Sequence, residues 1–136
     1  MTIDETLPKR SLTLHIALWA AQVLLSAVFL LAGFTKLTTP MPELVAMMPW
    51  AGDASHVFVR FVGMVDLAGG LGLILPTLTR IWPRVTVFAA AGCIALLICA
   101  FSLHAYRGEY EILWVNAVMI AMSGFIIWGR EWKQHL

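Results

Sequence analysis

The sequence predicts an all-α membrane protein in which four antiparallel transmembrane helices form one bundle. Composition is the first reason: 60% of the 136 residues are hydrophobic and only 12% are charged, whereas soluble domains carry about 25% charged residues. Four separate apolar segments are the second reason. The length corresponds to a single domain spanning residues 1–136. A formal net charge of +1 without a run of basic residues excludes nucleic acid as a partner.

Each of the four apolar segments has the length that a membrane-spanning helix needs, about 17 to 25 residues. They cover approximately residues 15–37, 57–75, 85–105 and 112–129. The first segment follows two basic residues, as the apolar core of a signal peptide would. It is longer than such a core and lacks a small-residue cleavage pattern, so we expect it to remain as a helix.

The distribution of Lys and Arg among the loops predicts the orientation. With a cytoplasmic N-terminus, six basic residues fall on the cytoplasmic side and three on the opposite side. The six are Lys9, Arg10, Arg80, Arg84, Arg130 and Lys133, and the three are Lys36, Arg60 and Arg107. Because cytoplasmic loops are enriched in Lys and Arg, we expect both termini to lie in the cytoplasm.

Prolines mark the connections between the segments. Pro76 is expected to end the second helix, and the sequence Trp82-Pro83-Arg84 to start the third. In the longer loop 38–56, Pro42 suits the first turn of a short helix. Such a helix would place Leu44, Met47 and Met48 on one apolar face. We expect an interfacial helix over the outer end of the bundle, and the alternative is an irregular loop.

Asp66 is the residue that most strongly indicates a function. It lies near the middle of the second apolar segment, where an aspartate costs about 2.5 to 3.5 kcal/mol on membrane-insertion scales. Such a residue is tolerated if its carboxyl group is protonated, is paired with a cation or faces a polar cavity. Ionisable residues within a membrane are functional candidates for this reason.

The other three segments also place polar residues in the outer half of the membrane. The candidate polar pocket comprises Lys36, Asp66, His104 and Asn116, with Arg60, Arg107 and Glu109 at its periphery. An alternative interpretation is purely structural. The cations would then extend to the headgroups, and the other polar groups would join helices by hydrogen bonds.

Several kinds of chemistry find no support in the sequence. No histidine pair has the i, i+4 spacing of a zinc site on a helix. His56, His104 and Glu109 could meet only if the outer loops brought them together, so no metal site is predicted. The sequence contains no nucleophile elbow and no glycine-rich phosphate loop after a strand. Catalytic residues therefore remain unassigned.

Two stretches carry a resemblance to a known family. The first is Gly33-Phe-Thr-Lys36-Leu37 at the end of the first segment, and the second runs from Asp66 through Gly70 to Pro76. Together with His104 and Asn116, they resemble the motifs of the DoxX-like membrane proteins over nearly the whole chain. The family usually has Glu where this chain has Asp66, so the carboxylate reaches one methylene less far.

The resemblance implies a small four-helix protein of the bacterial cytoplasmic membrane. One named relative is the small subunit of an archaeal thiosulfate:quinone oxidoreductase, and other members act with redox enzymes or as assembly factors. One hypothesis is therefore an accessory or quinone-interacting subunit of a membrane redox system. His104 and Lys36 would hold the quinone headgroup, and Asp66 would handle protons. The alternative hypothesis is a non-catalytic scaffold or chaperone-like bundle in which Asp66 pairs with Lys36 or Arg60. Under either hypothesis, the protein could also form a homo-oligomer.

Overall fold

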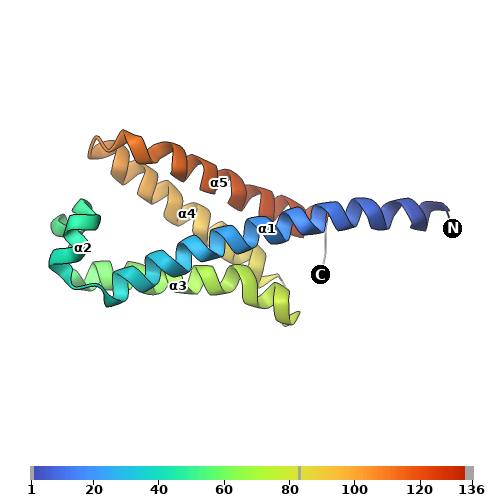
Figure 1. Ribbon diagram of the computed structural model, residues 1–136, viewed down its shortest axis with the longest axis horizontal. Helices are drawn as coiled ribbons and strands as arrows, with labels where there is room; N and C mark the ends of the chain where they lie inside the picture. The colour runs from blue at the N-terminus through green and yellow to red at the C-terminus, as the bar shows by residue number, and fades with distance from the viewer. Residues whose placement is uncertain (1, 83, 134–136) are drawn as a thin grey trace.

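The computed structural model describes residues 2–82 and 84–133, and this part of the chain is helical without a strand (Figure 1). Its four long helices are α1 (Thr2–Thr38), α3 (His56–Thr79), α4 (Val85–Tyr106) and α5 (Leu113–Ile127). The stretches long and apolar enough to cross a membrane are Leu12–Thr38, His56–Thr79, Val85–Tyr106 and Tyr110–Glu131. The prediction of four helices that are long and apolar enough to span a membrane is confirmed.

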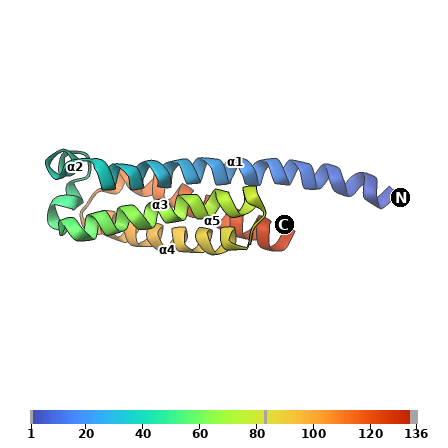
Figure 2. The same cartoon turned by 90° about the horizontal axis from the view of Figure 1, so that it is seen from below.

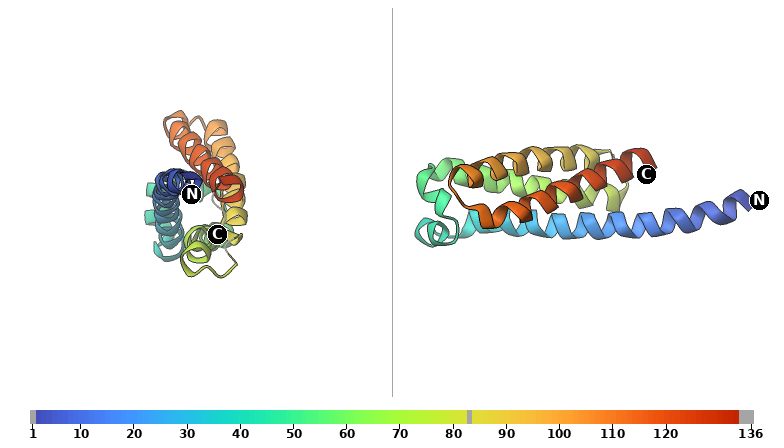
Figure 3. Two further views of the ribbon diagram at one scale, coloured as in Figure 1. Left: turned by 90° about the vertical axis from the view of Figure 1, so that its right-hand side faces the viewer. Right: turned by 90° about the horizontal axis from the view of Figure 1, so that it is seen from above.

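The long helices pack side by side in the order α1, α3, α4, α5, and α5 returns to contact α1. Figure 3 shows this arrangement along the bundle axis and from the side. The first turns of α1 extend beyond the other helices (Figure 2). Both ends of the described chain lie at one end of the bundle, and α2 lies at the other. We call these the terminal end and the α2 end.

An apolar core fills the space between the long helices. Its buried members are Ala21, Leu25, Phe29, Leu73, Ala90, Cys93, Leu97 and Ile126. Large apolar side chains also cover the outside of the bundle, where Phe34, Phe61 and Phe88 are 60 to 71% exposed. An outer surface of this kind suits contact with lipid tails, which are as apolar as the side chains themselves.

The connection between α1 and α3 contains the short helix that Pro42 predicts. Helix α2 spans Met41–Met47 with proline in its first turn, and a 3₁₀ turn, η1, follows at Pro49–Asp53. Leu44 is buried against Ala51 and Val59. Met47, however, is 62% exposed. The expected shared face is therefore wrong for Met47, whereas Met48 packs with Leu44 against the same cluster.

Ser55 begins α3 by capping its first turn. The Ser55 hydroxyl accepts a hydrogen bond from the Phe58 N–H at 3.1 Å. We expect Ser55→Ala to lower the free energy of unfolding by about 1 kcal/mol, because an unpaired N–H remains at the helix start. The measurement is unfolding in detergent. Ser102→Ala, at an exposed position within α4, is the matched control, and equal losses in both variants would contradict the capping role.

Pro76 does not end α3, contrary to the sequence prediction. The helix continues to Thr79 and ends at Arg80, which adopts a left-handed backbone with φ 60°. Proline removes one backbone donor, and membrane helices accommodate it when neighbouring helices supply hydrogen bonds. The carbonyl that Pro76 leaves without its helical donor is that of Gly72, and Gln22 Nε2 of α1 donates to the adjacent Leu73 carbonyl at 2.6 Å. The next helix begins at Val85, and Pro83 lies outside the described residues.

Candidate functional site

Two glycines bring α1 and α3 into close contact near the α2 end. A Cβ atom at Gly33 would lie 2.7 Å from the Gly63 carbonyl oxygen and 2.8 Å from the Leu67 nitrogen. A Cβ atom at Gly63 would lie 2.9 Å from Lys36 Cβ. Because the first two distances are to backbone atoms, any larger side chain at Gly33 would push the helices apart. The close approach leaves Lys36 and Asp66, each one turn further along its helix, facing each other.

Lys36 and Asp66 form a buried ion pair. The Lys36 ammonium donates to Asp66 Oδ2 at 2.6 Å, and the two side chains are 12% and 6% exposed. The ammonium also lies 5.9 Å from the centre of the Trp50 ring, within the range of a cation–π contact. Among the states that the sequence left open for Asp66, the structure shows pairing with a cation.

Arg60 belongs to the same region but serves the end of α1. Its Nη1 donates to the carbonyl oxygens of Lys36 at 2.6 Å and Thr39 at 2.9 Å. The last carbonyls of a helix have no partner within that helix. Arg60 of α3 therefore caps α1 and connects the backbone of Lys36 to the helix that carries Asp66.

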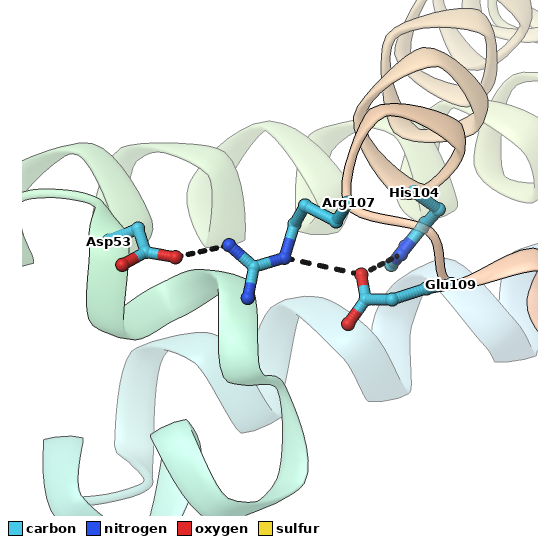
Figure 4. Close-up of polar contacts among 4 residues, drawn as sticks. All are labelled: Asp53, His104, Arg107 and Glu109. Carbon is cyan, nitrogen blue, oxygen red and sulfur yellow. Dashed lines mark hydrogen bonds and ion pairs between the residues drawn. The ribbon is translucent and has the colours of Figure 1, made fainter.

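His104 lies in a second polar group, formed by the connection between α4 and α5 (Figure 4). His104 Nδ1 is 2.9 Å from Glu109 Oε1, and Arg107 Nε is 3.4 Å from the same oxygen. Arg107 Nη1 also donates to Asp53 of η1. This hydrogen bond from Arg107 to Asp53 raises the pKa of Arg107, so the guanidinium stays charged at physiological pH. Figure 4 shows the side chains aligned between η1 and the α4–α5 connection.

Asn116 is buried on α5 with 7% of its surface exposed. Its side-chain Nδ2 has no hydrogen-bond partner in the part of the chain that the structure describes. The predicted pocket is thus divided into the Lys36–Asp66 pair, the His104–Glu109 contact and Asn116. Within the described residues, no hydrogen bond or ion pair joins these three parts.

Sequence reasoning missed another buried polar group, which lies toward the terminal end. We call it the arginine cluster, and it comprises His15, Trp19, Gln22, Thr77, Thr86 and Arg130. Gln22 Nε2 donates to Thr77 Oγ1 at 3.1 Å, and Arg130 Nε donates to Gln22 Oε1 at 2.6 Å. The hydroxyl groups of Thr77 and Thr86 are 2.7 Å apart. Gln22 lies within the first apolar segment, whereas Arg130 entered the prediction only as a loop charge.

The comparisons with known proteins agree with the motifs. The model of the DoxX-like family matches residues 20–126. The chain belongs to the DoxX-like family. The match includes the Lys36–Asp66 pair, His104 and Asn116. Family membership and the four apolar helices of membrane-spanning length together identify this DoxX-like chain as a multi-pass membrane protein. No curated protein and no solved structure matches the chain.

Proposed function

We propose that this DoxX-like protein is a non-catalytic membrane scaffold that holds a partner protein at the α2 end of its bundle. The Lys36–Asp66 pair carries the proposal. The Lys36 ammonium lies 2.6 Å from the buried Asp66 carboxylate. Asp66 of α3 therefore acts as a clamp that holds α1. Removing one partner of a buried ion pair leaves an uncompensated charge, which makes such a pair an effective constraint on helix packing.

Further contacts support a fixed surface at the α2 end. Arg60 connects α3 to the end of α1, and Arg107 connects the α4–α5 connection to η1. Exposed aromatic residues lie beside these contacts: Tyr106, Tyr110 and Trp114 are 68 to 92% exposed. Tyr and Trp are enriched where proteins bind each other. A second membrane protein is the partner class that fits this surface, and a redox enzyme is the class that the family motifs suggest.

The second candidate function is a quinone-interacting subunit of a membrane redox system, and Asn116 favours it. A quinone carbonyl needs a hydrogen-bond donor in an apolar setting, and the buried Asn116 Nδ2 is a donor without a partner among the described residues. Asn116 would donate to one carbonyl of the headgroup. A bound quinone would supply electron and proton transfer, with Asp66 as the candidate proton acceptor. His104 is already engaged by Glu109.

We also propose that the protein lies in the bacterial cytoplasmic membrane with both termini inside and α2 along the outer interface. The excess of basic residues in the loops on the side of the termini supports this orientation. The location of both ends of the described chain at the terminal end is consistent with it (Figure 1).

Quinone content separates the two candidate functions. We expect protein purified from bacterial membranes to carry no more extractable quinone than an unrelated four-helix membrane protein purified in parallel. We expect Asn116→Leu to leave that amount unchanged. The opposite result would be one bound quinone per protein that Asn116→Leu removes without changing the thermal midpoint. That result would contradict the scaffold function and support the quinone-interacting function.

A scaffold must also contact its partner in the membrane. Chemical cross-linking in intact membranes should give one discrete adduct with a second protein. The paired replacement Lys36→Met/Asp66→Leu should retain the adduct, because a scaffold needs the helix contact and not the carboxylate. Wild-type protein without an adduct to another protein would contradict the scaffold function.

A further inference from the structure

Arg130 is a buried cation at the terminal end of the bundle. It is 4% exposed, and its guanidinium lies 5.7 Å from the Trp19 ring. No ion pair contacts it in the part of the chain that the structure describes, and the adjacent Glu131 pairs with Arg84 instead. Buried charges are ordinarily paired with an opposite charge. Arg130 therefore has a charge without a protein counterpart among the described residues.

The local backbone places Arg130 inward. It lies in η3, a π-helical segment at Trp128–Lys133, and short π-helical segments occur frequently at functional sites. The preceding residue, Gly129, packs directly on α1, where a Cβ atom would lie 2.9 Å from Cγ of the fully buried Leu18. Glycine thus allows this segment to approach α1 closely enough for Arg130 to reach His15 and Gln22.

The arginine cluster contains more hydrogen-bond donors than acceptors. Trp19 Nε1 lies 3.0 Å from His15 Nε2, and Arg130 Nη1 lies 3.0 Å from His15 Nδ1. Trp and Arg side chains only donate, and a neutral imidazole can accept at only one of its two nitrogens. One N–H of His15 therefore faces another donor whichever tautomer is present.

Arg130 Nη2 adds to this excess of donors. It is buried and has no partner among the described residues. An oxygen atom that carries negative charge would satisfy Nη2 and balance the charge of Arg130. Arginine forms two parallel hydrogen bonds with phosphate, which makes phosphate a fitting group.

The position of the cluster also suits a phosphate. His15 lies five residues after Arg10, the last charged residue before the first apolar segment, and Arg130 is one residue from the end of the span Tyr110–Glu131. At 1.5 Å per residue, both lie within about 8 Å of such a boundary, where phospholipid headgroups are found. His15 is only partly buried, so the cluster reaches the surface at its imidazole.

We propose that the arginine cluster binds a phosphate group, with the Arg130 guanidinium as its donor. A phospholipid headgroup and a free phosphate ion share this chemistry. The site is separate from the Lys36–Asp66 pair and does not depend on the scaffold function.

The test uses full-length protein, stripped of lipid in a non-ionic detergent. The probes are phosphatidylglycerol, a diacylglycerol with the same acyl chains, and inorganic phosphate. Native mass spectrometry measures bound lipid, and the thermal midpoint measures stabilisation. Arg130→Gln is compared with Arg84→Gln, which removes the same charge near the same end from a side chain that is 75% exposed.

We expect wild-type protein and Arg84→Gln to bind one phosphatidylglycerol and to ignore the diacylglycerol. Arg130→Gln should bind phosphatidylglycerol about tenfold or more weakly, because a hydrogen bond to a charged group contributes about 1.5 to 3 kcal/mol. Arg130→Lys retains the charge but lacks the second donor nitrogen, so it provides the same comparison if Arg130→Gln does not fold. We expect its affinity to fall as well.

Three outcomes would overturn the proposal: Arg130→Lys binding phosphatidylglycerol as wild type does, equal losses in Arg130→Gln and Arg84→Gln, or equal stabilisation by the diacylglycerol. Inorganic phosphate distinguishes the two sources. If millimolar phosphate stabilises wild-type protein but not Arg130→Lys, the ligand is a soluble phosphate. If phosphate has no effect while phosphatidylglycerol binds, the ligand is a lipid headgroup.

Discussion

Lys36→Met is expected to lower the free energy of unfolding by about 3 to 5 kcal/mol, because it leaves the Asp66 carboxylate buried without its cation. Asp66→Asn should also destabilise the protein, since it removes the charge that Lys36 pairs with. The measurement is equilibrium unfolding in mixed micelles of a mild detergent and dodecyl sulfate, followed by circular dichroism.

The paired replacement Lys36→Met/Asp66→Leu distinguishes a clamp from a simple loss of packing. An apolar pair of similar volume often replaces a buried ion pair at little cost, so the double variant should recover most of the loss. The control is the ion pair of Arg84 and Glu131. Arg84 Nη2 lies 3.5 Å from Glu131 Oε1, and the two side chains are 75% and 34% exposed. Arg84→Gln should change stability by about 0 to 1 kcal/mol. If Lys36→Met costs no more than Arg84→Gln, the ion pair is not a clamp, and the proposed scaffold loses its main support.

Gly33→Ala is expected to cost about 1 to 3 kcal/mol, the usual range for overpacking a tight contact. The added methyl group would lie 2.7 Å from a carbonyl oxygen of α3. A backbone atom cannot move aside as a side chain can, so α1 and α3 must separate. Separation would also lengthen the Lys36–Asp66 contact.

Gly124→Ala is the matched control for Gly33→Ala. It makes the same change within a helix, but a Cβ atom there meets nothing within 4 Å. Alanine disfavours the unfolded chain relative to glycine, so this variant should be neutral or more stable by up to about 1 kcal/mol. The same unfolding measurement applies to both variants. Equal stability of Gly33→Ala and Gly124→Ala would show that the close approach of α1 and α3 is not required.

The four spans were predictable because length and apolar composition are local properties of the sequence. Pro76 shows where local reasoning fails. The helix continues through this proline beside α1, whose Gln22 donates to the Leu73 carbonyl in the turn before it. Proline alone predicts the end of a helix, whereas proline beside a donor from another helix does not.

The candidate site was predictable in part. Asp66 was identified from its position in an apolar segment, and Lys36 was one of its two expected partners. The separation of His104 from that pair was not predictable, since it depends on where the α4–α5 connection places Glu109. Asp53 carried no signal because it lies in a loop next to glycine. Arg130 was missed because a sequence does not reveal that the last turns of α5 continue as a π-helix that directs the residue inward.

The polar contacts between α1 and α3 follow one antiparallel alignment. Ser26 donates to the Gly70 carbonyl at 2.7 Å, Gln22 reaches Leu73 and Thr77 toward the terminal end, and Lys36 reaches Asp66 toward the α2 end. Sliding one helix by a single residue would move these partners about 1.5 Å past each other along the whole seam. In lipid, helices gain little from hiding apolar surface, so hydrogen bonds between helices carry a larger share of the preference for one alignment. The hydrogen bonds therefore set the depth of α1 relative to α3. Helices α4 and α5 then pack on this pair, α4 against α3 and α5 against α1.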